Sequence, residues 1–303
     1  MSSESQTQPR VISLIASATE ILHGLGAGNM QVARSHECDY PPLILDLPQL
    51  TRAKFKVHGA TSAEIDRSVK GLLEQGLAVY EVDADRMRAL EPDVILTQDQ
   101  CEVCAVSLAD VERALCTWTG SAARIVSLRP HTLADVYADI ETVADAIGRA
   151  QAGRDLVRSM QSRMAEIAAT VEGRSRPKLG FVEWIEPPMS GGHWMPEIIS
   201  IAGGISPVSW DDMAAADPDI LLVAPCGYDI ATSLPELEGL RSHAVFKTLR
   251  AVREGRIFVA DGNAFFNRPG PRIVESTEIL AEIMHPDVST YGHLGEAYVV
   301  WPT

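Results

Sequence analysis

Short apolar runs alternate along the chain with longer segments in which apolar residues recur every three or four positions. Residues 11–15 and 178–184 are two such runs, and each precedes a small polar loop and a helical segment that ends at glycine. Runs of this length predict buried strands, and strands that alternate with helices predict parallel sheets covered by helices. The pattern therefore indicates an α/β protein.

The two halves of the chain contain matching segments. Residues 91–96 (EPDVIL) and 217–222 (DPDILL) each place a proline before an apolar run, a pattern typical of a helix that ends just before a strand. Residues 123–128 (ARIVSL) and 255–260 (GRIFVA) form a second pair. The repeat predicts two lobes of similar architecture.

A long helical pattern lies between the halves. About 40 residues of continuous helix would measure roughly 60 Å, which is too long for one small lobe. The pattern predicts an N-terminal α/β lobe (1–131), a connecting long helix (132–173) and a C-terminal α/β lobe (174–303). Gly148 and Gly153 leave open the alternative of two helices with a break between them.

The chain is acidic, with 26 Lys and Arg residues against 41 Asp and Glu residues and a net charge of −15. This balance argues against nucleic acid as a partner, because binding to phosphate backbones depends on clustered basic side chains. No apolar run approaches the roughly 20 residues that span a bilayer. Residues 1–10 are polar and lack the apolar core of a signal peptide. The sequence therefore predicts a cytoplasmic protein, or a periplasmic or surface protein if a leader was removed.

Several short motifs follow one another along nearly the whole chain. They are residues 10–14 (RVISL) with Thr19 and Glu20, residues 39–42 (DYPP), residues 91–95 (EPDVI), Gly191 with Gly203 and Gly204, and residues 271–273 (PRI). With this succession the chain resembles the substrate-binding proteins of cobalamin and iron-siderophore ABC importers, class III of the periplasmic-type binding proteins. The resemblance implies two Rossmann-like lobes joined by one long α-helix, with a ligand cleft between the lobes.

Two departures accompany the resemblance. Residues 50–54 (LTRAK) stand where the B12-binding type has an aromatic residue, and an extra segment follows at about residues 55–79. The acidic residues with which the family docks onto its importer would fall near Asp85 and Asp211, although acidic residues are also common in the first turn of a helix.

Polar and aromatic side chains occur on the loops that follow the predicted strands, where open α/β sheets bind ligands. Flat aromatic faces suit a flat macrocycle, and His36 is a candidate ligand for the cobalt of a corrinoid. Small hydroxyl residues such as Ser17 and Thr19 can equally cap a helix. The predicted ligand-binding residues are Ser17, Thr19, His36, Tyr40, Gln100, Trp184, His193, Trp194, Phe265, Phe266 and Arg268.

Four cysteines are expected on the same loops. Thiolates bind soft metal ions such as zinc, so the sequence predicts metal ligands at Cys38, Cys101, Cys104 and Cys226. A single CxxC (Cys101 to Cys104) provides only two of the four ligands of a structural zinc site. Metal binding, thiol redox chemistry and free reduced thiols therefore remain open.

The chain contains none of the common catalytic signatures, such as a Walker loop or an HExxH motif. We expect a binding protein rather than an enzyme, with cobalamin, a related corrinoid or another metal-bearing macrocycle as its ligand. An ABC importer permease is the candidate protein partner. The alternative is a metal- or thiol-dependent protein that uses a cleft cluster of cysteines.

Overall fold

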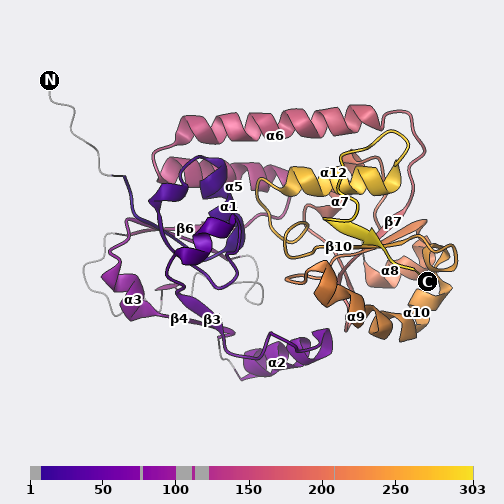
Figure 1. Ribbon diagram of the computed structural model, residues 1–303, viewed down its shortest axis with the longest axis horizontal. Helices are drawn as coiled ribbons and strands as arrows, with labels where there is room; N and C mark the ends of the chain where they lie inside the picture. The colour runs from indigo at the N-terminus through magenta and orange to yellow at the C-terminus, as the bar shows by residue number, and fades with distance from the viewer. Residues whose placement is uncertain (1–7, 76–77, 100–110, 113–122, 208, 303) are drawn as a thin grey trace. The chain divides into compact units, whose positions relative to one another are not determined.

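The computed structural model describes residues 8–75, 78–99, 111–112, 123–207 and 209–302 (Figure 1). Contacts between residues divide the chain into two compact units. Unit 1 comprises Met1–Val57, Val69–Pro130 and Asp135–Val157, and unit 2 comprises His58–Ser68, His131–Ala134 and Arg158–Thr303. The predicted α/β class is confirmed, because each unit is built on a mostly parallel sheet with helices.

Unit 1 contains a four-stranded parallel sheet in the order β2-β1-β5-β6. The central strands β1 and β5 are buried along their whole length, as expected for strands covered on both faces. A separate antiparallel pair of strands, β3 and β4, comes between β2 and β5 in the sequence. The strands are β1 (Val11–Ser13), β2 (Gln31–Arg34), β3 (Thr51–Ala53), β4 (Tyr80–Val82), β5 (Val94–Gln98) and β6 (Arg124–Leu128).

The described helices between residues 8 and 99 are short. They are α1 (Ala16–Gly24), η1 (Gly28–Met30), η2 (Pro42–Asp46), α2 (Ser62–Glu74) and α3 (Ala84–Ala89). Helix α2 lies in the extra segment 55–79, and its residues up to Ser68 group with unit 2. The units therefore differ here from lobes divided at residue 131.

Unit 2 contains a five-stranded sheet in the order β11-β10-β9-β7-β8. Its three inner strands are parallel, and the two edge strands β8 and β11 are antiparallel. Side chains on β7, β9 and β10 pack against Met213, Leu237 and Phe246 in one apolar core. The strands are β7 (Leu179–Trp184), β8 (Met189–Ser190), β9 (Ile220–Val223), β10 (Ile257–Ala260) and β11 (Tyr298–Val300).

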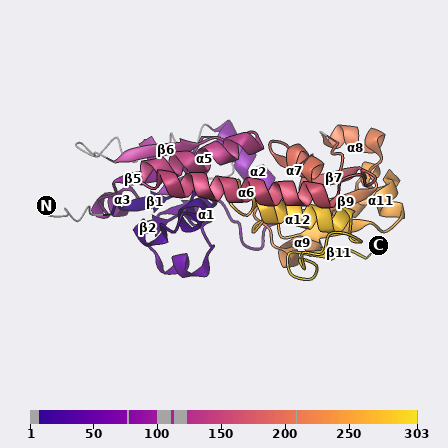
Figure 2. The same cartoon turned by 90° about the horizontal axis from the view of Figure 1, so that it is seen from above.

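Six helices accompany the sheet of unit 2 in the described chain. They are α7 (Met195–Ile201), α8 (Trp210–Ala216), α9 (Ile230–Ser242), α10 (Ala244–Thr248), α11 (Arg250–Arg253) and α12 (Ile273–Met284). The C-terminal part of α6 (Ala150–Thr170) runs alongside α12 (Figure 2), where Arg163 pairs with Glu278 at 2.6 Å and with Glu275 at 3.3 Å.

The helical pattern predicted over 132–173 as one connecting helix requires a correction. The structure shows two helices, α5 (Leu133–Ala146) and α6 (Ala150–Thr170), and Gly148 between them has φ +72°. A positive φ ends a helix at little cost only at glycine. Among the helices that the structure describes, the 21-residue α6 is the longest, and its two ends belong to different units.

Gly153, the other glycine of the predicted break, lies inside α6 and serves a different purpose. A Cβ atom at this position would stand 2.5 Å from the Cβ atom of Ala144 on α5. The absence of a side chain therefore allows α5 and α6 to pack closely. None of the helices in the described parts of the chain is both long enough and apolar enough to cross a bilayer.

Candidate functional site

The loop after β1 contributes two of the predicted ligand-binding residues, and the structure places both inside α1. Ser17 and Thr19 are almost completely buried, and the helix cap is Ile15, whose side chain makes no capping hydrogen bond. The capping alternative is therefore wrong for both residues. The hydroxyl of Thr19 donates to Cys38 Sγ at 3.1 Å and accepts from Gln31 Nε2 at 3.2 Å. Thr19 thus belongs to a buried polar network rather than to an exposed ligand surface.

Cys38 lies in the same network and is fully buried. Its sulfur also lies 3.8 Å from the carbonyl oxygen of Ser13. A thiol enclosed by its own unit in this way does not face solvent, so the prediction that Cys38 contributes to an open metal site is not supported by its surroundings. Ser17 Oγ is buried without a hydrogen-bond partner in the structure as described.

His36 and Tyr40 follow β2 and stand closer to solvent. Both the backbone N–H and Nδ1 of His36 lie within hydrogen-bond distance of Thr51 Oγ1, at 3.0 and 2.7 Å. Burial, aided by the charge of Arg34, lowers the pKa of His36 to about 4, so the ring is neutral near pH 7. Tyr40 exposes 44% of its surface. This loop therefore offers a fixed neutral imidazole and an exposed phenol ring.

In unit 2, Trp184 is the last residue of β7, and His193 and Trp194 follow β8. Trp184 is half-buried, its ring lies edge-on to Tyr228 with 5.6 Å between centroids, and its indole N–H donates to the Glu186 carbonyl oxygen at 3.1 Å. His193 is exposed, adopts φ +53° and stacks on the ring of Trp194. A positive φ at a residue other than glycine is a strained conformation that commonly marks a functional site.

Trp194 and Phe266 are structural rather than ligand-facing. Both are buried, and the indole N–H of Trp194 donates to the Phe266 carbonyl oxygen at 3.2 Å. The Phe266 ring packs against Phe181 with a centroid distance of 5.5 Å. Each large aromatic side chain thus packs within unit 2, and a ligand contact at these two positions stays a prediction.

The loop after β10 also holds Phe265 and Arg268. Phe265 is half-buried beneath the guanidinium of Arg272, at 5.4 Å from the ring centroid. Arg268 is buried and donates to Asn263 Oδ1 at 2.7 Å. Both side chains therefore have a partner inside unit 2, and Phe265 is the more accessible of the two.

Two groups in unit 2 were missed by the sequence analysis. His131 and His193 bring their Nδ1 atoms to 3.2 Å, and burial together with His131 lowers the pKa of His193. Tyr228 is buried, its hydroxyl has no hydrogen-bond partner in the described structure, and burial and Glu236 raise its pKa to about 12. Both His131 and Tyr228 follow predicted strands, so the rule applied to their neighbours would have included them.

The predicted cluster of four cysteines is not assembled by the described residues. Cys38 is buried in unit 1 and Cys226 is half-exposed in unit 2, while Cys101, Cys104 and the neighbouring Gln100 lie outside the described residues. Within the described ranges, no three His, Cys, Asp or Glu side chains are grouped so that they could hold a metal ion.

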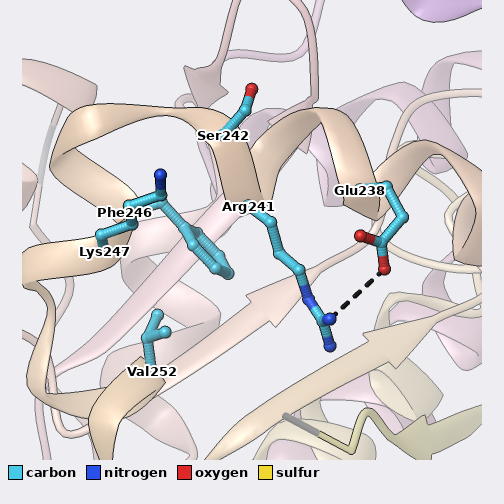
Figure 3. A pocket seen from close by; sticks show the side chains of 6 residues that line it. All are labelled: Glu238, Arg241, Ser242, Phe246, Lys247 and Val252. Atoms are coloured by element: carbon cyan, nitrogen blue, oxygen red, sulfur yellow. Dashed lines mark ion pairs between the residues drawn. The ribbon is translucent and has the colours of Figure 1, made fainter.

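A hollow on the surface of α9, α10 and α11 contains none of the predicted site residues (Figure 3). Its main polar group, the Arg241 guanidinium, lies over the Trp301 ring at 4.2 Å and donates to the Pro302 carbonyl oxygen at 3.0 Å. Glu238 lies 3.5 Å from the same guanidinium. Because Arg241 is engaged by the protein itself, the hollow offers little to hold a polar ligand. The lining residues are Glu238, Arg241, Ser242, Phe246, Lys247 and Val252.

Two α/β units with aromatic and imidazole side chains after their strands define a small-molecule binding protein. The model of the periplasmic binding protein family matches residues 11–264, and the chain belongs to this family. The resemblance to periplasmic-type substrate-binding proteins found in the sequence is thus confirmed.

Known relatives cover nearly the whole chain. A vitamin B12-binding protein of Vibrio cholerae is 21% identical over 281 residues, 89% of this chain and 86% of that protein. The uncharacterized ABC transporter substrate-binding lipoprotein YvrC of Bacillus subtilis is 22% identical over 294 residues, 92% of this chain and 80% of that protein. The structure of the periplasmic heme-binding protein RhuT from Roseiflexus is similar with a TM-score of 0.68 and 20% identity, and the match covers 93% of this chain and 100% of that chain.

These comparisons change two of the sequence-based expectations. A cytoplasmic location is not supported, because the family consists of periplasmic binding proteins and the Bacillus relative is a lipoprotein. The alternative of a thiol- or metal-dependent protein with a cysteine cluster is not supported either, because the relatives are binding proteins.

Proposed function

We propose that the protein is the substrate-binding component of an ABC importer and that its ligand is cobalamin or a related metal-bearing macrocycle. The proposal rests on the family match over residues 11–264 and on a vitamin B12-binding relative that aligns over 89% of the chain. The heme-binding protein among the similar structures keeps heme as the nearest competing ligand. On this proposal the protein works outside the cytoplasm.

The accessible side chains on the strand-end loops supply the proposed ligand contacts. Tyr40 and Trp184 offer aromatic faces for a flat macrocycle. His36 and His193 both have pKa values below the usual range because they are partly buried, so their rings are neutral, the form that coordinates cobalt or iron. Among the predicted site residues that the structure describes, these four are exposed or half-buried, as is Phe265.

Asp85 and Asp211 are the proposed contacts for the importer permease. Asp85 lies in the first turn of α3 with 94% of its side chain exposed, and Asp211 lies exposed in the first turn of α8. A negative charge in the first turn of a helix is stabilised by the helix dipole. One such group on each unit can pair with basic side chains on a partner protein.

Titration of the purified protein with cyanocobalamin, cobinamide and haemin tests the proposal. Visible absorbance and calorimetry should reveal one ligand bound at about micromolar concentration or below. Trp184→Ala should weaken that binding, whereas Trp301→Ala, which removes the buried ring beneath Arg241, should not. Failure of all three ligands to bind at micromolar concentration would disprove a corrinoid or heme ligand.

A further inference from the structure

The extra segment of the chain, which contains α2, is attached to unit 2 at one defined point. The carboxylate of Glu236 on α9 accepts two hydrogen bonds from Ser62, from the backbone N–H at 2.9 Å and from the hydroxyl at 2.8 Å. Ser62 is fully buried, and Ile65 one turn later is buried too. Residues 58–68 accordingly group with unit 2 although they lie far from it in sequence.

The start of α2 is built to receive this carboxylate. Thr61 and Glu64 form a reciprocal cap, in which Glu64 accepts from the Thr61 N–H at 2.9 Å and Thr61 Oγ1 accepts from the Glu64 N–H at 3.3 Å. The N–H of Ser62 is thereby left for an outside acceptor, and Glu236 provides it. A negative charge is stabilised at a helix start by the helix dipole, so the contact favours both partners.

The anchor also lies next to residues that carry the proposed ligand surface of unit 2. Glu236 is close enough to Tyr228 to help raise the pKa of its phenol, and the Tyr228 ring packs edge-on against Trp184. Tyr228 directly precedes Asp229, the cap of α9, so the helix that holds Ser62 through Glu236 begins beside the Tyr228–Trp184 pair. The buried Tyr228 hydroxyl has no hydrogen-bond partner in the described structure.

We propose that residues 58–68 are a strap, anchored by Glu236, that covers the Trp184–Tyr228 surface of unit 2 and controls access of the ligand to it. The control of access rests on the function proposed above, whereas the covering of the surface does not. The strap acts by releasing Ser62 from Glu236, which exposes Trp184 and lets the ligand enter and leave.

Two variants release the anchor from opposite sides. Glu236→Ala removes the acceptor. Ser62→Pro removes both donors, and α2 tolerates proline in its first turn because that N–H has no partner within the helix. Glu238→Ala is the matched control, since Glu238 is an exposed carboxylate on the same helix that pairs only with Arg241 in the described contacts.

Hydrogen exchange and hydroxyl-radical footprinting, both read by mass spectrometry on the ligand-free protein, test the strap without any ligand. In both variants, exchange of the amides at 63–66 should rise at least about tenfold, as expected when a local opening becomes easier. Oxidation of Trp184 should rise with it, while Trp301 should remain as in the wild type. Unchanged exchange, or faster exchange with Trp184 still protected, would overturn the proposal.

Stopped-flow measurements with whichever macrocycle binds then test access. Release of the strap should raise both the association and the dissociation rate by about threefold or more, which a general loss of stability would not do. Rates equal to those of the wild type would overturn the control of access. If no macrocycle binds, the proposed function fails, and the footprinting still decides whether the strap covers the surface.

Discussion

The two units place a histidine after a strand in very different surroundings. In unit 1, His36 is half-buried, meets Thr51 with two of its nitrogen atoms, and has a pKa of about 4. In unit 2, His193 is exposed, strained at φ +53° and paired with a second imidazole. His36 is thus held within unit 1 by its hydrogen bonds, whereas His193 keeps its ring at the surface of unit 2. Unit 2 is thus the better candidate for direct chemical recognition of a ligand.

If unit 2 recognises a ligand through side chains on its surface loops, the backbones of those loops must be held rigidly. Gly262, after β10, leaves no room for a side chain, because its Cβ would stand 2.1 Å from the Pro225 carbonyl oxygen in the loop after β9. Backbone atoms cannot rotate away, so Gly262→Ala should destabilise the protein by about 3 kcal/mol or more. Urea denaturation measures the change.

Gly192→Ala is the matched control, because a Cβ at Gly192 meets no atom within 4 Å. It should change the free energy of unfolding by about 0.5 kcal/mol or less. Equal losses in the two variants would show that close contact between the loops does not hold unit 2 together.

The polar network of unit 1 should contribute to the stability of the protein rather than to its affinity for the ligand. Thr19→Val keeps the shape of the side chain but removes the partner of Cys38 and Gln31. The loss of a buried hydroxyl should cost about 1–3 kcal/mol in the free energy of unfolding. Exposed Thr142, which bonds only to the Ala138 carbonyl oxygen in the described contacts, provides the control Thr142→Val. A Thr19→Val protein of normal stability that binds ligand poorly would place Thr19 in the ligand site after all.

The fold could be predicted from the sequence because it depends on patterns that repeat. The buried strands Val94–Gln98 and Ile220–Val223 both lie where a proline precedes an apolar run. The break between α5 and α6 could be given only as an alternative to one helix over 132–173. The apolar periodicity continues across Gly148, while the positive φ there is set by local backbone geometry.

The site was harder to predict, because the sequence shows which residues follow a strand but not which way they face. The sequence predicts that Thr19 binds the ligand and that Cys38 binds a metal ion, yet the two side chains contact each other inside unit 1. The sequence predicts that Trp194 contacts the ligand, yet its indole N–H donates to the Phe266 carbonyl oxygen. Contacts between residues 62 and 236 have no local signal at all. Only the packing of distant segments decides which polar groups remain available.

The burial of His36 predicts a specific dependence of stability on pH. Its pKa is about 4 in the folded protein and near 6.5 when unfolded, so between these values the unfolded state binds the additional proton. The contribution is therefore fully present above pH 6.5 and is lost as the pH falls toward 4. Between pH 7 and pH 5 the loss should be about 1–2 kcal/mol.

Denaturation of His36→Gln at a series of pH values checks this dependence. The variant should lose less stability than the wild type over the same range, while His58→Gln, at an exposed position, should follow the wild type. Parallel curves for the wild type and His36→Gln would mean that His36 is not held neutral by its surroundings.

A substitution that relieves the strained backbone at His193 should raise the stability of the protein, because this strain is maintained for something other than stability. Glycine adopts φ +53° readily, so His193→Gly should raise the free energy of unfolding by about 0.5–1 kcal/mol. His193→Ala keeps the strain and should not give this gain, so the two variants separate backbone from side chain. Both should weaken binding of the ligand, because both remove the imidazole beside His131. A glycine variant that is more stable and binds as tightly as the wild type would show that the strain at His193 serves no ligand, and the contrast between the two units would then be one of packing alone.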